Sequence, residues 1–398
     1  MKEENYSMVA TTMMGLEDIL AEELRLLGAQ HINVLNRAVE FVGDVGFMYK
    51  ANLNLRTAIR ILKPIFSFKA RNEKELYRKI YEYDWEQHFG VDGTFAIQSA
   101  GLSEVFSHSK YTSLKTKDAI ADSFRDKHGK RPNVDVEAPD VQINVHVRDN
   151  SFVISLDSSG YSLHKRGYKV ASVDAPINEV LAAALILLSD WNQISNFYDP
   201  MCGSGTILLE AALIANNIPA NIFRKRFGFV GWKDFDEELW NKIRDISLEK
   251  EKEYYGIISG ADNFQKSLRA ARANINNALM RDDIKIKMND FFETKVAPGT
   301  HVVFNPPYGE RMEIGINEFY QKIGDTLKHN YQGCTVWLIS SDIENLKMIG
   351  LKPSRKIKIF NGKLECRFVK YQMYKGTKKL HKYENRDNNE TLDEKTED

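Results

Sequence analysis

Four short segments of the chain carry groups that could bind a ligand or take part in a reaction. The first is Asp199-Pro-Met-Cys-Gly203-Ser-Gly205-Thr206, between a predicted strand and an apolar helix. Glycines in such a turn let the backbone approach a ligand, and N–H groups at a helix N-terminus attract an anionic group such as a carboxylate. The segment is neither a Walker A loop, which needs Gly-Lys-Ser/Thr, nor a dinucleotide GxGxxG loop, because it lacks the last glycine. A tight turn without a ligand is the alternative interpretation.

Acidic residues follow the next two predicted strands. Asp262, in Gly260-Ala-Asp262, opens a helix at the carboxyl end of its strand. In doubly wound folds a carboxylate at this place accepts the ribose hydroxyls of a nucleotide-like cofactor, although an acid there is also a common helix cap. Asn289-Asp290-Phe291 ends the following strand, where it would meet an adenine ring.

The fourth segment, Asn305-Pro306-Pro307-Tyr308-Gly309-Glu310-Arg311, indicates which reaction the site would serve. The prolines remove two backbone donors and stiffen the loop, which leaves the Asn305 side-chain carbonyl and the Pro306 backbone carbonyl as paired acceptors. Two acceptors beside an aromatic ring fit the exocyclic amine of a base lying flat against Tyr308, and stacking of this kind contributes about 1–3 kcal/mol. A proline-rich turn with a packing tyrosine is the alternative.

Composition limits the class of protein. The chain has 398 residues, 55 Lys+Arg against 55 Asp+Glu and 43% hydrophobic residues, which is globular composition with room for two or three domains. Its three cysteines are far apart and its histidines are scattered, so we expect neither a disulfide framework nor a metal site. The N-terminus lacks the features of a signal peptide, and the longest apolar run, residues 180–188, is too short to cross a bilayer. We therefore expect a cytoplasmic protein without a membrane partner.

The elements that must position these segments follow from the hydrophobic pattern. Residues 8–60 predict a β-α-β unit whose helix ends at Gly28, and residues 61–168 predict longer elements ending in a hairpin at Asp149-Asn150. After about residue 175, strands alternate with helices, which predicts an α/β, mostly parallel, doubly wound sheet. Residues 375–398 are rich in Lys, Glu, Asp and Asn, and we expect them to be disordered.

Several of these segments together resemble a known family. DPMCGSGT, Asp262 and NPPYGER look like class I S-adenosylmethionine-dependent amino-methyltransferases, and residues 163–186 look like their additional cofactor-binding motif ahead of the sheet. The region ending SLDSSGYSLHKRGY resembles a THUMP domain, an RNA-binding module. With the small N-terminal unit, this is the layout of the bacterial 23S ribosomal RNA guanine-N2 methyltransferase L family.

The resemblance implies four segments: a ferredoxin-like unit (1–60), a THUMP domain (61–168), a Rossmann-like methyltransferase domain (169–375) and a disordered tail (376–398). It implies S-adenosylmethionine as cofactor, bound by Asp199, Pro200, Gly203, Gly205, Thr206, Asp262, Asn263, Asp290, Phe291 and Asn305. The target base would be held by Asn305, Pro306, Pro307 and Tyr308. Longer family members append a second methyltransferase domain, for which this chain ends too soon, so only the guanine-N2 activity is expected.

RNA, either 23S ribosomal RNA or a pre-ribosomal particle, is the partner that the resemblance implies. The net charge of zero does not favour nucleic acid, but local basic groups could. Basic residues lie near Tyr111, Tyr168 and Phe227, which could stack on bases. The candidates for RNA contacts are Lys115, Lys117, Lys165, Arg166, Arg224, Lys225, Arg226 and Arg311.

Two other functions fit the same residues. An adenine-N6 methyltransferase acting on DNA or RNA would use the same Asn305–Tyr308 loop, because this loop does not distinguish the amines of adenine and guanine. The THUMP-like region disfavours DNA. A non-catalytic RNA-binding assembly factor could have kept the cofactor pocket, although the intact Asn305, Tyr308, Gly203 and Asp262 favour an enzyme.

Overall fold

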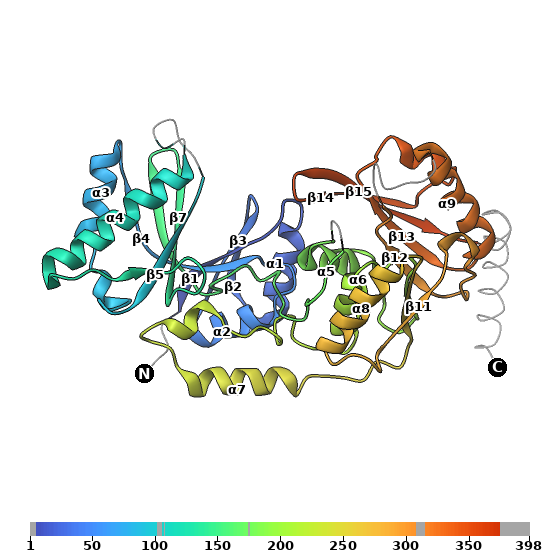
Figure 1. The fold of residues 1–398 in the computed structure, drawn as a ribbon, viewed down its shortest axis with the longest axis horizontal. Helices are drawn as coiled ribbons and strands as arrows, with labels where there is room; N and C mark the ends of the chain where they lie inside the picture. The colour runs from blue at the N-terminus through green and yellow to red at the C-terminus, as the bar shows by residue number, and fades with distance from the viewer. Residues whose placement is uncertain (1–4, 102–105, 107, 174–175, 308–314, 375–398) are drawn as a thin grey trace, which may run out of the picture. The chain divides into compact units, whose positions relative to one another are not determined.

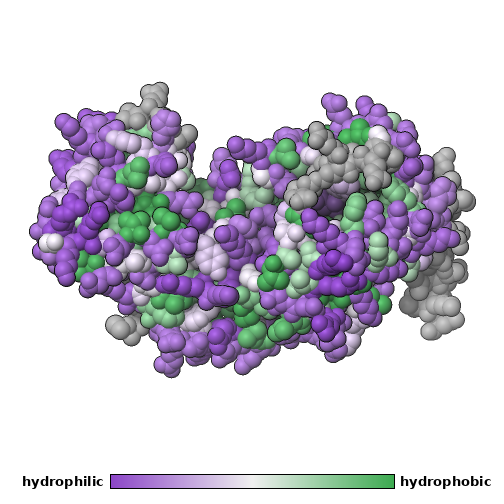
Figure 2. Space-filling view, viewed as in Figure 1, coloured by the Kyte–Doolittle hydropathy of each residue, from purple (hydrophilic) through white to green (hydrophobic). Residues whose placement is uncertain are grey.

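The computed structural model describes residues 5–101, 106, 108–173, 176–307 and 315–374, and the chain divides into two compact units. Unit 1 comprises Met1–Gly167 and Asn217–Glu251, and unit 2 comprises Tyr168–Asn216 and Lys252–Asp398. The chain therefore leaves unit 2, contributes residues 217–251 to unit 1 and then returns (Figure 1). Hydrophilic residues cover much of the face shown in Figure 2.

Unit 1 is built on one sheet with the strand order β2-β3-β1-β4-β8-β7-β5-β6. The strands are β1 (Tyr6–Thr11), β2 (Gln30–Leu35), β3 (Ala38–Gly43), β4 (Arg60–Lys69), β5 (Thr94–Ala100), β6 (Asn133–Val134), β7 (Val141–Arg148) and β8 (Ser151–Asp157). The helices are α1 (Glu17–Leu27), α2 (Val45–Asn54), α3 (Glu73–Glu82), α4 (Ser109–His128) and α7 (Glu237–Leu248), with 3-10 turns η1 (Trp85–Gln87) and η2 (Gly228–Gly231). Because β4 pairs with both β1 and β8, the two α+β parts share a continuous sheet.

The sequence pattern predicted some of these elements and missed others. The hairpin at Asp149-Asn150 is confirmed: Arg148 pairs with Ser151, and Asp149 has a positive φ of 54°. The helix stop at Gly28 is also confirmed, since this residue caps α1 in the left-handed conformation. The alternating segment after it is instead two strands, β2 and β3, that turn at Arg37, where φ is 57°. Strand β4 was not foreseen, because Pro64 lies inside it, at an irregularity in the pairing with β8.

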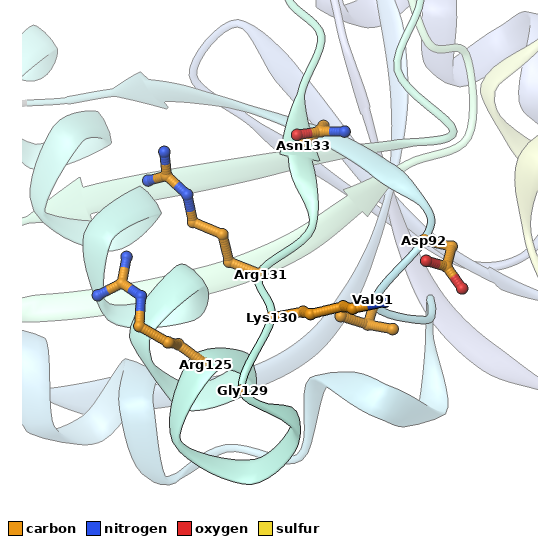
Figure 3. Close-up of a pocket in the computed structure, with 7 residues that line it drawn as sticks. All are labelled: Val91, Asp92, Arg125, Gly129, Lys130, Arg131 and Asn133. Carbon is orange, nitrogen blue, oxygen red and sulfur yellow. The ribbon is translucent and has the colours of Figure 1, made fainter.

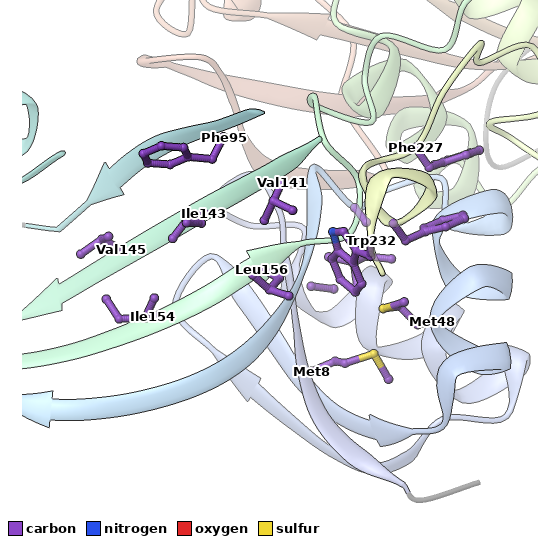
Figure 4. Close-up of a cluster of buried hydrophobic side chains, with 14 of the residues drawn as sticks. Met8, Met48, Phe95, Val141, Ile143, Val145, Ile154, Leu156, Phe227 and Trp232 are labelled. Atoms are coloured by element: carbon purple, nitrogen blue, oxygen red, sulfur yellow. The ribbon is translucent and has the colours of Figure 1, made fainter. Parts of the chain in front are cut away.

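Residues 217–251 complete the hydrophobic core of unit 1. Tyr49 of α2 lies against Phe229, with ring centroids 4.4 Å apart, and its hydroxyl accepts the Asp236 N–H. Trp240 of α7 contacts the Tyr49 ring edge-on. Phe227 and Trp232 are buried in the same cluster as Met8, Met48 and the sheet residues drawn in Figure 4. The segment is therefore part of the folded core of unit 1.

Unit 2 contains the doubly wound sheet, with the strand order β11-β10-β9-β12-β13-β15-β14. The strands are β9 (Phe197–Asp199), β10 (Ile258–Asp262), β11 (Ile284–Met288), β12 (His301–Phe304), β13 (Thr335–Ser340), β14 (Arg355–Asn361) and β15 (Leu364–Gln372). The helices are α5 (Glu179–Leu188), α6 (Thr206–Ala215), α8 (Gln265–Asn277) and α9 (Ile316–Asn330), with 3-10 turns η3 (Phe291–Glu293) and η5 (Asn345–Ile349).

The predicted parallel α/β sheet is confirmed for β9 to β13, whose mutual pairings are all parallel. The antiparallel strands β14 and β15, which extend one side of the sheet, were not foreseen. The strand order reverses direction between β9 and β12, and ligands of open α/β sheets bind at the carboxyl edge of such a switch point. No helix among the described residues is long and apolar enough to span a membrane. The tail after residue 374 lies outside the described residues.

We predict that Arg224 is a stability residue of unit 1. It is buried, and its guanidinium donates to the backbone carbonyls of Ser159, Tyr161, Ser162 and Lys165 at 2.9–3.0 Å. Arg224→Met removes four charge-assisted hydrogen bonds to backbone carbonyls, so it should lower the midpoint of the unit 1 transition in calorimetry by several degrees.

Arg226→Met is the matched control, since the Arg226 side chain is 40% exposed and forms an ion pair with Asp140 at 3.3 Å at the surface of the described chain. It should change stability by less than about 1 kcal/mol. Equal loss of stability in the two variants would contradict the assignment.

Candidate functional site

The glycine segment forms a turn between β9 and α6. Gly203 and Gly205 both have positive φ, 54° and 80°, a conformation that strains other residues. Gly205 caps α6, and a Cβ at Gly205 would lie 3.3 Å from the Cβ of Ala271. Among the residues that the structure describes, only the Cγ2 of Val173, at 3.8 Å, lies within 4 Å of the place a Cβ of Gly203 would occupy. These residues therefore leave the face of the turn at Gly203 open to a ligand.

Two predicted carboxylates meet at this turn. The Gly203 N–H donates to Oδ2 of Asp262 at 2.9 Å, and the Phe264 N–H donates to Oδ1 at 2.9 Å. A carboxylate has about four lone-pair sites, so Asp262 keeps acceptor capacity for the two hydroxyls of a ribose. β9 and β10 are paired in parallel with Asp199 beside Gly260, which brings the two strand ends together.

Asp199 is buried at the end of β9, where one carboxyl oxygen accepts the Met201 N–H at 3.1 Å. Burial raises the pKa of Asp199 well above the usual carboxyl range, and the negative charge of Asp262 raises it further. A cationic ligand group would offset this cost by favouring the ionised carboxylate. The site is thus suited to a ligand that carries a positive charge next to a ribose.

The chain is closely packed where Gly260 of β10 lies against Leu208 and the end of β9. A Cβ at Gly260 would lie 2.4 Å from Cδ1 of Leu208 and 3.1 Å from the Asp199 carbonyl oxygen, so a larger residue there would force Leu208 to move. Cys202 is buried in the same turn, and its N–H donates to the Ala261 carbonyl at 2.9 Å. Burial raises the pKa of the Cys202 thiol well above its ordinary value, so the thiolate is disfavoured.

The remaining predicted residues occupy the neighbouring strand ends. Asp290 is partly buried and accepts the Phe292 N–H at 2.8 Å, while Asn263 is exposed after β10. The Phe291 ring is buried between Phe304 and Tyr331, with centroids 5.4 Å away, so in this structure it is a core residue.

Asn305, Pro306 and Pro307 come directly after β12, the strand next to β9. Asn305 is partly buried and Pro306 is buried. This places the predicted acceptors at the carboxyl edge that also carries Asp199 and the glycine turn. Tyr308 and Arg311 lie outside the described residues.

Asn274, in α8, is a site residue that the motifs did not reveal. Its Oδ1 accepts the N–H groups of Val170 and Ala171 at 2.8 and 2.9 Å. Its Nδ2 donates to the carbonyls of Ala171 and Ser204, both at 2.9 Å. Asn274 is 1% exposed and thus joins the glycine turn to residues 170–173, which bring Val173 beside Gly203.

One turn further along α8, Asn277 donates to the Tyr168 carbonyl at 3.0 Å, so both asparagines hold the same segment. Asparagine is a poor helix former. Two asparagines three residues apart in a predicted helix therefore indicate side chains that hydrogen-bond groups outside that helix.

The residues predicted to contact RNA are divided by burial. Arg166, like Arg224, is buried: its guanidinium donates to the Leu163 carbonyl and to Oδ1 of Asn221. The interior placement of both is a correction to the expected RNA contacts, because their donors serve the chain itself. Tyr168 and Phe227 are buried as well and are not placed to stack on bases.

The other described candidates lie at the surface or partly buried. Lys165 and Lys225 are exposed. Lys115 lies 4.0 Å from Glu73, Lys117 pairs with Asp118 at 2.7 Å, and Arg226 pairs with Asp140. All of the described candidates in this set belong to unit 1. In the described part of the chain, no group of three His, Cys, Asp or Glu could hold a metal ion.

The sheet order, the glycine turn after β9 and the Asp262 carboxylate at the end of β10 define a class I, S-adenosylmethionine-dependent methyltransferase. Residues 166–370 match the family model described as RMKL-like, methyltransferase domain. Residues 70–157 match the THUMP domain, and residues 7–62 match the RlmL ferredoxin-like domain. The chain belongs to the RMKL-like methyltransferase family.

Relatives agree with this assignment. The chain is 38% identical to slr0064 of Synechocystis sp., provisionally named an RNA methyltransferase, over 92% of this chain and 96% of that protein. It is 33% identical to ribosomal RNA large subunit methyltransferase K/L of Syntrophotalea carbinolica, over 92% of this chain but only 53% of the relative. The chain therefore spans about half the length of that K/L protein. The solved structure of SMU.472, provisionally named a methyltransferase and complexed with SAH, superposes with a TM-score of 0.83 at 29% identity and covers 95% of this chain and 100% of that one.

We predict that Asn274 positions the cofactor turn. Asn274→Ala removes four hydrogen bonds that join this turn to residues 170–171, each worth about 0.5–1.5 kcal/mol, and each 1.4 kcal/mol lost from the binding conformation lowers affinity about tenfold. The dissociation constant for S-adenosylhomocysteine, measured by calorimetry, should rise roughly 10- to 100-fold.

Asn216→Ala is the control. Asn216 is also a buried asparagine of unit 2, but it bonds Asp283 and the Tyr254 N–H, away from the turn. This variant should bind the cofactor product as the unchanged chain does. If Asn216→Ala weakens binding as much as Asn274→Ala, the effect is a general loss of packing.

We also predict that binding of S-adenosylmethionine releases a proton. Because the pKa of Asp199 is raised, the folded, ligand-free chain favours the protonated carboxyl group. The stability that this group contributes to the ligand-free fold is fully present below the ordinary carboxyl pKa. This stability is lost as the pH rises through the raised pKa of Asp199. A bound cation stabilises the carboxylate, so affinity should increase with pH above about 4, within that window.

Calorimetry in two buffers of different ionisation enthalpy should detect this proton release, and Asp199→Asn should abolish it. Affinity that is independent of pH in the unchanged chain would contradict the prediction.

Proposed function

We propose that this chain transfers the methyl group of S-adenosylmethionine to an exocyclic amine of an RNA base, and that the base is a guanine of 23S ribosomal RNA methylated at N2. In this proposal residues 1–60 and 61–168 bind and orient RNA, and residues 169–375 hold the cofactor and the base. The observation that supports it most is that Asn305-Pro306 directly follow β12, the strand paired with β9, whose last residue is Asp199; the Asp262–Gly203 contact lies at the same edge of the sheet.

The cofactor would be held by residues whose contacts fit its parts. The open face at Gly203 and the buried Asp199 suit its cationic end, and the remaining acceptor capacity of Asp262 suits its ribose. In this proposal the exposed Asn263 and the partly buried Asp290 would lie on the adenine side of the cofactor. When bound, the cofactor supplies a methyl group activated by a positively charged sulfur.

The chain's own residues would position the amine. The Asn305 side-chain carbonyl and the Pro306 carbonyl accept its two N–H groups, which aims the nitrogen lone pair outward. Catalysis then comes mainly from holding nitrogen and methyl carbon about 3–3.5 Å apart. The same two acceptors stabilise the positive charge that builds on the nitrogen. A target inside a helix must be flipped out to reach them.

RNA is favoured over DNA by the THUMP match and by relatives named as RNA and ribosomal RNA methyltransferases. THUMP-containing chains use the domain for RNA, and the surface residues Lys115, Lys117, Lys165, Lys225 and Arg226 remain our candidates for phosphate contacts, together with Arg311. The choice of guanine N2 over adenine N6 rests on the family resemblance, because Asn305 and Pro306 accept either amine.

The test is transfer of a labelled methyl group to 23S RNA from cells that lack this protein, followed by nucleoside digestion and chromatography. We expect label in N2-methylguanosine. Asn305→Ala should reduce transfer roughly 100-fold or more and weaken cofactor binding much less, because the acceptor it removes acts mainly in the transition state.

The outcomes separate the alternatives. Label in N6-methyladenosine would overturn the base, and transfer to DNA alone would overturn the substrate. RNA binding without any transfer would indicate an assembly factor. Loss of cofactor binding and transfer to the same extent in Asn305→Ala would contradict the role given to Asn305.

A further inference from the structure

A basic pocket lies in unit 1, within the residues that match the THUMP domain. Its volume is about 450 Å³, and it is lined by Arg125, Lys130 and Arg131 with a single carboxylate, Asp92. In Figure 3 the Arg125 and Arg131 side chains extend in the same direction, whereas Lys130 reaches toward Val91 and Asp92. Three positive charges around one pocket repel one another, and a bound anion would offset this electrostatic repulsion.

The helix dipole explains only some of the local basic residues. Arg125, Lys127 and His128 lie in the last turn of α4, where cations offset the negative end of the helix. Lys127 and His128 also contact Glu86. Lys130 and Arg131 follow the helix cap, and neither has a carboxylate within 4 Å in the part of the chain that the structure describes. Their charges are therefore available to a ligand.

The backbone around the pocket is well fixed. Gly129 ends α4 with a φ of 67°, and its N–H donates to the Arg125 carbonyl at 2.8 Å. Pro132 is buried, and the next residues, β6, pair with β5. Arg125 itself is held by Asp122 at 2.6 Å while remaining 50% exposed. A Cβ at Gly129, which lines the pocket, would meet no described residue within 4 Å.

We propose that Arg125, Lys130 and Arg131 form a subsite for backbone phosphates of the RNA, separate from the residues predicted from the sequence. The guanidinium group presents a planar fork of donors that matches two phosphate oxygens, and it remains charged at any physiological pH. The identity of the anion as RNA rests on the proposed function; the existence of an anion subsite rests on the geometry and charge of the pocket.

The test uses the full chain with Lys130→Gln/Arg131→Gln, leaving Arg125 and its partner Asp122 intact. Binding of a 23S RNA transcript is measured by fluorescence anisotropy at several salt concentrations. Each lost phosphate contact lowers the slope of log affinity against log salt by about 0.7–0.9, so the double variant should lower it by about 1.4–1.8. In methylation assays the KM for RNA should rise, with kcat and cofactor affinity unchanged.

Arg25→Gln/Arg78→Gln is the matched control. It removes the same charge from unit 1, but these arginines pair with Glu22 and Glu82 on their own helices. The control should keep the salt slope of the unchanged chain. Equal slopes for the two double variants, or failure of the unchanged chain to bind RNA, would overturn the proposal.

A competition experiment distinguishes a phosphate ligand from an acidic peptide. Polyuridylate should displace the transcript from the unchanged chain far better than polyglutamate of equal charge, and equal displacement would overturn a phosphate subsite in favour of an acidic-peptide surface. If RNA binding depends on the pocket but no base is methylated, the subsite stands and the proposed function fails. If RNA is methylated with the same KM in the double variant, the proposed function stands and the subsite fails.

Discussion

The hydrogen bond from the Gly203 N–H to the Asp262 carboxylate organises the catalytic unit. It joins the turn after β9 to the end of β10, and the parallel pairing of these strands places both ends at one edge of the sheet. The glycines are required because the turn has positive φ at two positions and because a side chain at Gly260 would force Leu208 to move. The residues proposed to bind the cofactor, and the Asn305-Pro306 segment that follows β12, lie at this same edge of the sheet.

Buried polar groups support the same edge from behind. Asn274 hydrogen-bonds four backbone groups, three in residues 170–171 and one at Ser204 of the glycine turn, and so ties these two segments together. Such a residue acts on the reaction by holding other groups, since it presents no free donor or acceptor of its own. The chemistry of methyl transfer suits this design, because it depends on positioning more than on a strong acid or base.

Residues 217–251 are held in unit 1 by hydrophobic packing. Residues 217–251 lie between two elements of the methyltransferase sheet in sequence, yet their aromatic rings complete the core of unit 1. Two arginines with donors directed at backbone carbonyls, Arg166 and Arg224, hold the chain next to this core. Positive charge in this region therefore serves folding, and the charge available to RNA must come from the surface, at residues such as Lys130 and Arg131.

The sequence by itself determined the parallel α/β sheet, the glycine turn, the acids at the ends of β10 and β11, and the Asn305-Pro306-Pro307 segment. Each of these is a local signal: a hydrophobic period, a glycine where φ must be positive, or a residue at a strand end. Only the tertiary structure decided that Phe291, Tyr168, Arg166 and Arg224 are interior residues, that residues 217–251 belong to unit 1, and that Asn274 holds the turn. The burial and the hydrogen-bond partners of a residue depend on segments that are far apart in the chain. The local sequence around an arginine therefore does not show whether its guanidinium faces water or backbone carbonyl groups.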